Sequence, residues 1–444
     1  MKATSRWRYA LPFVLYLILC AMYLQAIPPG ESPDEPSHLQ CIEQVTRYNR
    51  IPIVDPKPGG TIWWARERII SGLECIQMPL YYFLTGYTQR LVEFATNTPT
   101  HYEFPPNNPD WASGKGKSSA MFVHSAEFSG SEPLALIALR LESIALGGLT
   151  IAASGIVAKR LAPEHTETHL AAMVLVAGWP QFIFMSRAIN NDVLATALAV
   201  GTLAMLVSVG RPSRFATAGL LASLAVLSKI TMVFAASTVL ITYAIEIVVA
   251  SNKKSYILPG LVVTGVFSAT AALILLQPTL RLNYDWSQQT IAGINAAATT
   301  VAYWRDVLYT SLQSGWARLG WMNVVTPEWQ AVAWWSLLIV AGTIGAWASW
   351  RANQQHSRLV LIICAIWLLA ILAGYLRINL NRFQPQFRYA FATIPVFAAL
   401  ASCGLKTLLI RHDRLVGLLA PLIALTLLLV NLWIIMVVAI PAYR

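Results

Sequence analysis

The stretch Glu31-Ser-Pro-Asp-Glu-Pro-Ser-His38 follows almost directly after the first apolar segment of the chain. It places three carboxylates and one imidazole where a chain that leaves a membrane should reach water. Pro33 and Pro36 bracket the Asp-Glu pair, and each proline fixes its own φ and disfavours helix at the residue before it. The acids therefore lie on a stiffened turn. This turn is either an ordinary solvated loop, or it carries the catalytic base of an enzyme that works at the water–lipid boundary.

The composition of the whole chain predicts an all-α integral membrane protein. Of its 444 residues, 56% are hydrophobic and 12% are charged, and the mean hydropathy is +0.54. Soluble proteins carry about 25% charged residues. The net charge of +11 lies mostly in short basic clusters between apolar segments. That is the positive-inside pattern, so the charge indicates orientation and no nucleic-acid partner.

Apolar segments that approach the roughly 20 residues needed to cross a bilayer recur along the chain. They predict about 11 transmembrane helices, at 9–27, 133–158, 169–188, 191–209, 214–228, 231–250, 256–276, 331–350, 359–376, 389–406 and 415–440. The first is read as an uncleaved helix because Ala26-Ile27-Pro28-Pro29 is a poor cleavage site. Segment 78–94 is short and rich in Tyr, so it is predicted to lie at the membrane interface. With this parity the basic clusters and the N-terminus face the cytoplasm.

The predicted topology divides the chain into five parts. These are the first transmembrane helix (1–27), an extracytoplasmic loop with the acidic motif and juxtamembrane helices (28–131), transmembrane helices 2–7 (132–276), a second extracytoplasmic loop (277–330) and transmembrane helices 8–11 (331–444). Within the first loop, 37–49 is predicted to form an amphipathic helix and 97–131 a mobile loop. Cys41 and Cys75 both lie in this loop and are candidates for a disulfide if the loop is outside the membrane.

Charged residues on the predicted outer face need a reason other than orientation. Arg388, next to Gln386 and Tyr389, suits bidentate phosphate binding. Lys229 lies in an apolar stretch, where it either snorkels to the interface or binds phosphate.

The tight outer turn Ser186-Arg-Ala-Ile-Asn-Asn-Asp192 offers Arg187 as a second phosphate ligand. Asp192 is either a helix cap or a second carboxylate facing the first loop, where it steers a hydroxyl or shares a divalent cation (Mg or Mn) with Asp34. Further along, Arg318 and Trp321 either mark the interfacial belt or bind a charged sugar. The sequence contains no Walker loop, no Rossmann glycine pattern, no metal-spaced Cys/His set and no GxSxG elbow.

Taken together, several short motifs resemble the C-type (GT-C) glycosyltransferase superfamily, and within it a bacterial family of predicted membrane proteins with a Pro-Asp-Glu-Pro-x-His motif. The motifs that carry the resemblance, spread over residues 28–390, are Pro33-Asp-Glu-Pro-Ser-His38, Met78-Pro-Leu-Tyr-Tyr82, Asn191-Asp192, Gly315-Trp-Ala-Arg-Leu-Gly-Trp321 and Gln386-Phe-Arg-Tyr389. Members of the superfamily take a sugar from a polyprenyl-phosphate carrier on the outer face of the membrane. The resemblance implies a GT-C-like fold, with Asp34 as the catalytic carboxylate and Asp192 as the second acidic position.

The resulting hypothesis is an inverting glycosyl transfer (hexosyl or pentosyl) in the bacterial cytoplasmic membrane, to an envelope glycan, lipid or protein. Asp34 is the base, Glu35 and His38 orient the base or the acceptor, and Arg388 and Lys229 offset the charge on the leaving phosphate. A polytopic transporter or lipid flippase is one alternative, although it should show internal repeats. A polymerase or ligase of lipid-linked glycans is another, with the same donor and a different acceptor.

Overall fold

The computed structural model describes residues 7–52, 73–102, 105–111, 118–124, 133–290, 293–352, 355–409 and 412–443. In this part of the chain, helices make up nearly everything, and the one sheet is a two-stranded antiparallel hairpin, β1 (Arg318–Leu319) with β2 (Val324–Val325). The Pro- and Gly-rich stretch predicted through Gly60 lies almost wholly outside the described residues, as does much of the predicted mobile loop 97–131.

The helices follow the predicted apolar segments closely. In chain order they are α1 (Ala10–Ala26), α2 (Glu35–Tyr48), α3 (Leu80–Thr96), α4 (Leu134–Leu161), α5 (Thr166–Ala177), α6 (Pro180–Ser186), α7 (Asn191–Leu206), α8 (Arg214–Ser228), α9 (Val233–Val249), α10 (Ile257–Leu276), α11 (Pro278–Thr290), α12 (Val301–Trp316), α13 (Glu328–Arg351), α14 (Gln355–Asn381), α15 (Ile394–Leu408), α16 (Asp413–Trp433) and α17 (Ile440–Tyr443). The short 3₁₀ segments are η2 (Trp7–Tyr9), η3 (Leu73–Ile76), η5 (Ile230–Met232), η6 (Lys253–Tyr256), η7 (Ala296–Thr299) and η8 (Phe387–Thr393), and η9 (Ile434–Ala439) is a π-helical turn.

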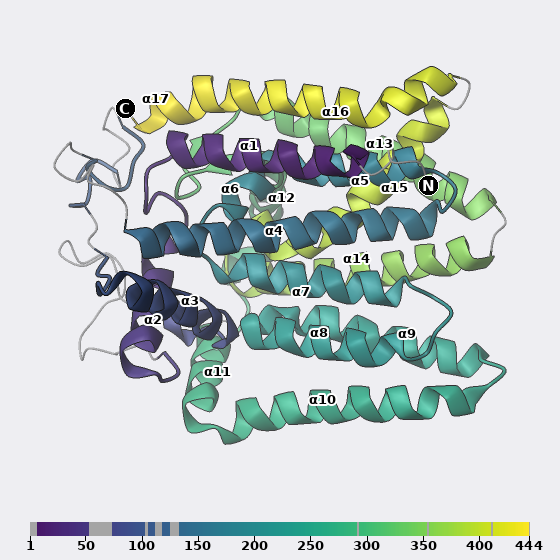
Figure 1. Ribbon diagram of the computed structural model, residues 1–444, viewed down its shortest axis with the longest axis horizontal. Coiled ribbons are helices and arrows are strands. Elements are labelled where there is room, and N and C mark those ends of the chain that lie inside the picture. Colours follow the sequence, from purple (N-terminus) through teal and green to yellow (C-terminus); the bar gives the residue numbers. More distant parts are fainter. Residues whose placement is uncertain are drawn as a thin grey trace.

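The long helices lie side by side in one bundle (Figure 1). The helices α2, α3 and α11 gather at one end, which we call the acidic end because it carries the turn 31–38. At the other end, which we call the basic end, α4 finishes with Lys159 and Arg160 and α5 begins. The orientation of the two ends in a membrane stays a prediction.

Among the described residues, seven helical segments are long and apolar enough to cross a membrane, and the bent pair α5–α6, with 62° between its halves, adds one more if it is a single span. Three shorter apolar helices, α1, α7 and α8, lie in the same bundle. The protein is therefore a multi-pass membrane protein. The total of 11 crossings stays a prediction, because α1, α7 and α8 are each 17 residues or shorter.

The closest contact between long helices depends on two glycines. A Cβ at Gly345 of α13 would lie 2.0 Å from the carbonyl oxygen of Leu400, and one at Gly404 of α15 would lie 1.8 Å from that of Ala341. Only glycine permits backbones to approach this closely, and small residues are the usual contact between membrane helices. Because α15 follows η8 directly, this contact holds η8 firmly against the bundle.

The segment that follows α1 contains the two helices predicted there. The predicted helix 37–49 is α2 and the predicted interfacial segment 78–94 is α3; both are present and pack on each other over a small core that includes Leu39, Val45 and Tyr81. A disulfide joins Cys41 of α2 to Cys75 of η3. The region 277–330, predicted as a loop, instead contains α11 and α12.

Glu31 holds a distant segment against the acidic turn. Its fully buried carboxylate accepts hydrogen bonds from the backbone N–H groups of Met121 (2.9 Å) and Phe122 (3.0 Å), and contacts the His124 ring at 2.8 Å. The sequence placed this acid in water. The structure corrects that expectation, because residues 118–124 fold back and supply the donors that replace water.

Candidate active site

Asp34 lies at the start of α2 in a conformation that few residues adopt. Its backbone is left-handed, with φ 65° and ψ −2°, and such a conformation in a residue other than glycine is uncommon and is concentrated at functional sites. The Asp34 side chain does not cap α2. Instead its Oδ2 lies 2.5 Å from Nη2 of Arg388. The strained turn therefore aims this carboxylate away from its own helix and toward η8.

Asp192 faces the same place from the first turn of α7. The cap of α7 is Asn190, whose side chain accepts a hydrogen bond from the N–H of Val193 at 3.2 Å. The cap reading that the sequence left open for Asp192 is therefore wrong, because Asn190 already fills that position. The Asp192 carboxylate is 2% exposed and points into the cluster, where Lys229 binds its Oδ1.

Lys229 occupies a break between two helices. Its extended backbone, with φ −152° and ψ 120°, ends α8 and precedes η5. The side chain is 5% exposed, forms an ion pair with Asp192, and places its Nζ 4.5 Å from the centre of the Tyr389 ring. The snorkelling reading left open by the sequence does not hold, because the ammonium group is buried against a carboxylate and an aromatic ring.

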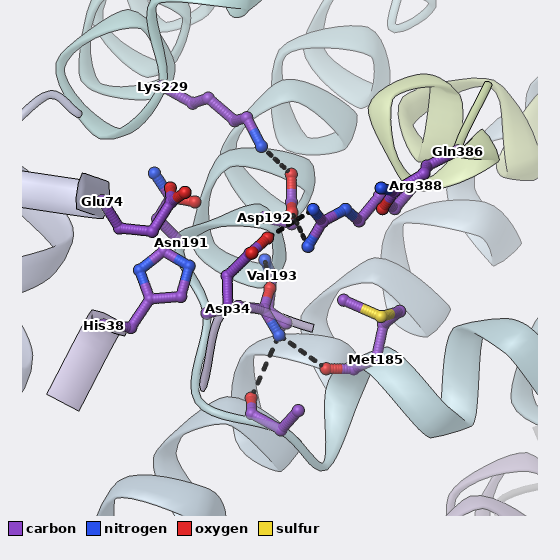
Figure 2. Close-up of polar contacts among 12 residues, drawn as sticks. Asp34, His38, Glu74, Met185, Asn191, Asp192, Val193, Lys229, Gln386 and Arg388 are labelled. Carbon is purple, nitrogen blue, oxygen red and sulfur yellow. Dashed lines mark hydrogen bonds and ion pairs between the residues drawn. The ribbon is translucent and has the colours of Figure 1, made fainter. Parts of the chain in front are cut away.

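Arg388 joins the two carboxylates. Besides its contact with Asp34, its Nη1 lies 3.6 Å from Oδ2 of Asp192 (Figure 2). The Nε atom of Arg388 is buried and has no hydrogen-bond partner among the described residues. Oδ2 of Asp192 likewise accepts no hydrogen bond there, although it lies within ion-pair distance of Arg388. Buried polar atoms are nearly always satisfied, so these two mark places for a ligand or water.

Asp34, Asp192, Lys229 and Arg388 thus form a four-residue cluster, which we call the outer cluster, from four distant parts of the sequence. Its two carboxylates and two cations balance in charge. Burial alone raises the pKa of Asp34, but the Arg388 guanidinium and the Lys229 ammonium hold that pKa below its usual range. Asp34 is therefore ionised at neutral pH.

His38 stands behind Asp34 on the next turn of α2. Its Nδ1 lies 3.0 Å from the hydroxyl of Tyr82, whose O–H donates to the carbonyl of Glu74 at 2.8 Å. Burial lowers the pKa of His38 to about 4, although Asp34 and Asp192 act in the opposite direction. The imidazole is therefore neutral at pH 7 and serves as a fixed polar group rather than a cation.

Glu74 is a site residue that the sequence reading missed. Figure 2 shows its side chain and that of His38 extending from one side toward Asp34 and Asp192. Burial, followed by the charge of Asp34, raises the pKa of Glu74 to about 7. Its neighbour Cys75 was the available signal, because a disulfide to α2 brings the residue before it to the base of the acidic turn.

Two predicted residues are buried in a supporting network instead. Glu35 is fully buried and accepts hydrogen bonds from the N–H of Gly30 (3.0 Å) and of Ile189 (3.2 Å). Arg187 is also fully buried and donates to the Ser32 hydroxyl at 2.9 Å. Each holds the turn 28–35 against the turn before α7. We therefore correct their predicted roles, since neither is among the contacts of the outer cluster.

The remaining predicted residues lie around the outer cluster. Tyr389 stacks under both cations, and Gln386 keeps a buried side-chain oxygen with no hydrogen-bond partner in the described structure. Arg318 donates from Nε to the carbonyl of Met322 at 2.5 Å, within the β1–β2 hairpin. Trp321 donates to the carbonyl of Gly30 at 3.1 Å. The last two fix the hairpin beside the acidic turn, and their predicted sugar contact stays a prediction.

An apolar cavity of about 370 Å³ has Ile230, the residue after Lys229, in its wall. Its walls come from α8, η5, α9, α10 and α11. Phe267, Leu275 and Tyr284 line its far side. An apolar cavity suits a hydrocarbon chain, and its lining residues include none of the four outer-cluster residues.

The divalent cation predicted at Asp34 and Asp192 stays a prediction. Asp34 and Asp192 are engaged by Arg388 and Lys229, and the described part of the chain contains no group of three or more His, Cys, Asp or Glu side chains placed to hold a metal ion. Mg²⁺ is usually held by one or two carboxylates together with waters and substrate phosphates, so a group of three protein ligands is not required for it.

No protein-family profile and no curated protein sequence matches this chain. Solved structures do. The oligosaccharyltransferase AglB from Archaeoglobus fulgidus, in complex with an inhibitory peptide and a dolichol-phosphate, is 12% identical with a TM-score of 0.53, over all of this chain and 56% of AglB. ArnT from Cupriavidus metallidurans, bound to undecaprenyl phosphate, is 13% identical with a TM-score of 0.56, over all of this chain and 74% of ArnT. The chain thus spans little more than half the length of AglB. At this identity the similarity establishes architecture, and the architecture of this protein is the GT-C fold.

Proposed function

We propose that this protein is a membrane glycosyltransferase that moves a sugar from a polyprenyl-phosphate donor to an acceptor hydroxyl. The observation that carries the proposal is the outer cluster, where two carboxylates and two cations from distant segments meet. The GT-C fold adds support, because the solved structures with this fold include complexes with dolichol-phosphate and undecaprenyl phosphate.

The donor is proposed to bind with its phosphate at Lys229 and Arg388. Its hydrocarbon tail enters the apolar cavity that has Ile230 in its wall. The free N–H of Arg388 Nε supplies a donor that no carboxylate uses, and Arg guanidinium groups suit phosphate oxygens. The two cations then stabilise the negative charge that develops on the phosphate as it leaves.

In the reaction proposed, the acceptor oxygen attacks the anomeric carbon from the face opposite the phosphate. The bond between the anomeric carbon and the phosphate oxygen breaks, and the phosphate keeps the electron pair, so the configuration inverts. Asp34 takes the proton of the acceptor hydroxyl. Its ion pair with Arg388 keeps it ionised, and its strained backbone orients it toward the cluster.

The acceptor is proposed to be an envelope glycan, lipid or protein, on the extracytoplasmic face of a bacterial cytoplasmic membrane. The basic end of the bundle would face the cytoplasm and the acidic end the outside. This orientation puts the outer cluster, α2 and α3 together at the outer interface. No step is assigned to a divalent cation, and metal dependence is tested by adding a chelator to the assay.

The experiment that tests the function incubates the purified protein with labelled polyprenyl-phosphate sugars and follows the release of sugar from the lipid. Asp34→Asn keeps the shape of the side chain and removes the base, so transfer should fall by about 10²–10⁴-fold. Asp285→Asn is the matched control, because Asp285 is an exposed acid paired with Arg281 at 2.9 Å. Near-normal transfer by the Asp34 variant would remove the assignment.

The same assay distinguishes the rival functions. A transporter or flippase would move the labelled lipid across a vesicle membrane without breaking the bond between sugar and phosphate. A glycan polymerase or ligase would release the lipid phosphate only when a lipid-linked glycan is supplied as the acceptor. Transport without sugar release would therefore contradict the transferase proposal.

A further inference from the structure

A second cavity lies at the basic end of the bundle, away from the outer cluster. Its volume is about 260 Å³, and its walls come from the loop between α4 and α5 and from the ends of α13, α14 and α15. We call it the basic-end pocket and define it by Ala162, His165, Thr168, Ser349, Ser357 and Lys406. It is more polar than the apolar cavity with Ile230 in its wall, because hydroxyl, imidazole and ammonium groups line it.

Two groups in the basic-end pocket lack the partners that such groups normally have. Thr168 is fully buried, and its hydroxyl has no hydrogen-bond partner in the described structure. The Nζ of Lys406 lies 3.0 Å from Nε2 of His165, and no described carboxylate lies within ion-pair distance of it. Burying a hydroxyl without a hydrogen-bond partner costs free energy. The Thr168 hydroxyl and the Lys406 ammonium are therefore two donors that suit an anionic ligand.

The charge around the pocket is mainly positive. The helices that end at the pocket carry cations in their last turns: Lys159 and Arg160 on α4, Arg351 on α13 and Lys406 on α15. Two acids lie close by: Glu164 lines the pocket and is exposed, whereas Glu167 is paired with Arg8 at 2.5 Å. The balance favours an anionic ligand, since one acid is neutralised and the other is in water.

The aromatic residues of α13 fix the depth of the pocket in the membrane. Trp347 and Trp350 are exposed on α13, and exposed tryptophans of membrane proteins gather at the level of the lipid headgroups. The guanidinium of Arg351 lies 4.4 Å from the Trp347 ring centre, and that of Arg358 lies 5.4 Å from that of Trp350. Ser349, in the pocket wall, is between these tryptophans in sequence. The pocket therefore lies at the headgroup level of the leaflet at the basic end.

We propose that the basic-end pocket binds the phosphate headgroup of an anionic phospholipid. The ammonium of Lys406 and the hydroxyl of Thr168 hold the phosphate oxygens, while the acyl chains extend along the apolar surface of the bundle. Anionic headgroups are bound by basic pockets between transmembrane helices at this level. The site is separate from the outer cluster, so the lipid acts as a structural ligand of the bundle and not as a substrate.

The test uses the full-length protein in a neutral detergent, with dioleoyl phosphatidylglycerol, dioleoyl phosphatidylcholine or inorganic phosphate added in parallel. Bound lipid is counted by native mass spectrometry, and the melting temperature is recorded with each addition. Phosphatidylglycerol should be retained and should raise the melting temperature, because a ligand bound only by the folded state stabilises it. Lys406→Gln should weaken its binding by about tenfold, since one hydrogen bond to a charged group is worth about that factor.

The control variant is Lys254→Gln, which removes an exposed cation at the same end without touching the pocket. It should bind phosphatidylglycerol as the wild-type protein does. Thr168→Val, which keeps the side-chain shape, should weaken binding by about tenfold, because the hydroxyl donates to a charged phosphate oxygen, and it replaces Lys406→Gln if that variant does not fold. Equal binding of the two lipids, equal binding by the Lys406 and Lys254 variants, or equal stabilisation by inorganic phosphate would each overturn the proposal.

Discussion

This protein contains two groups of buried ion pairs that differ in hydrogen bonding and in backbone geometry. Arg214 of α8 and Glu246 of α9 form one group near the basic end, with side chains 4% and 5% exposed. The outer cluster around Asp34 and Arg388 forms the other. Both are buried in a membrane protein, where charges are costly and often functional. Burial alone therefore does not tell which group is a site.

The difference lies in how completely each group is satisfied. Glu246 accepts hydrogen bonds from Arg214 and from the hydroxyl of Tyr256 (3.3 Å), and Arg214 also donates to the carbonyl of Leu206 at 3.2 Å. In the outer cluster, the Nε of Arg388 has no partner among the described residues, and Asp34 has a left-handed backbone. A satisfied pair joins two helices, whereas an incompletely satisfied and strained cluster has capacity left for a ligand.

The largest loss of transfer is expected from changing Arg388. Arg388→Gln should lower transfer by about 10³-fold, because it removes a preorganised donor to the leaving phosphate. Arg388→Lys should recover only part of the rate, since an ammonium group does not reproduce the planar fork that spans Asp34 and Asp192.

The measurement is the initial rate of sugar release, with the melting temperature recorded for each variant. Arg281→Gln serves as the control, because Arg281 is exposed and pairs with the acid four residues later. A rate within threefold of the wild-type value for Arg388→Gln would mean that the outer cluster is structural, as the Arg214 pair is.

The second test changes the ion pair between Arg214 and Glu246. Glu246→Gln should lower the free energy of unfolding by about 3 kcal/mol, the low end for a buried pair that loses one charge. The low end applies because Arg214 keeps its hydrogen bond to Leu206. Transfer per folded molecule should stay at the wild-type level, since Glu246 lies outside the outer cluster.

Thermal or denaturant unfolding in detergent measures the first quantity, and the rate normalised to folded protein measures the second. Tyr256→Phe is the milder companion variant, because it removes only the hydrogen bond to Glu246. A loss of transfer in Glu246→Gln that exceeds its loss of folded protein would contradict the purely structural role.

The sequence predicted the helices and the individual charged residues, but not how those residues come together. Apolar runs predicted nearly every helix, because a bilayer forces long hydrophobic segments and leaves helices as the way to satisfy the backbone. Asp34, Asp192, Lys229 and Arg388 were each singled out because a charge beside an apolar segment is unusual. Their convergence depends on helix packing, as at Gly345 and Gly404, which no single segment encodes.

Other features were beyond the reach of local patterns. Glu35 sits beside Asp34 in the sequence, yet the left-handed backbone at Asp34 turns the two carboxylates apart, one into the outer cluster and one toward Gly30 and Ile189. Glu246 had no visible partner in the sequence, because Arg214 lies 32 residues earlier on another helix. Glu74 was missed because its role depends on the disulfide that brings η3 to α2.

The smallest expected effect is on the pH dependence of the transfer rate, and it tests whether Glu74 belongs to the site. Asp34 and His38 do not titrate between pH 6 and 8, because their pKa values lie below that range, whereas burial and Asp34 raise the pKa of Glu74 to about 7. If Asp34 passes the acceptor's proton on to Glu74, transfer requires ionised Glu74. The wild-type rate should therefore rise as pH increases through about 7 and then level off.

Glu74→Gln should remove this rise and lower the rate at pH 8 by about tenfold, at the weak end of what one proton-transfer group contributes. At pH 6, where Glu74 is mostly protonated, variant and wild type should differ much less. Lys229, Arg388 and Asp192 also face Glu74, and their charges stay in place in this variant. The control is Glu43→Gln, since Glu43 lies on α2 but pairs with Arg47. A pH profile of Glu74→Gln that matches the wild-type profile would show that Asp34 completes the proton transfer without Glu74, and the outer cluster would then consist of its four ion-paired residues alone.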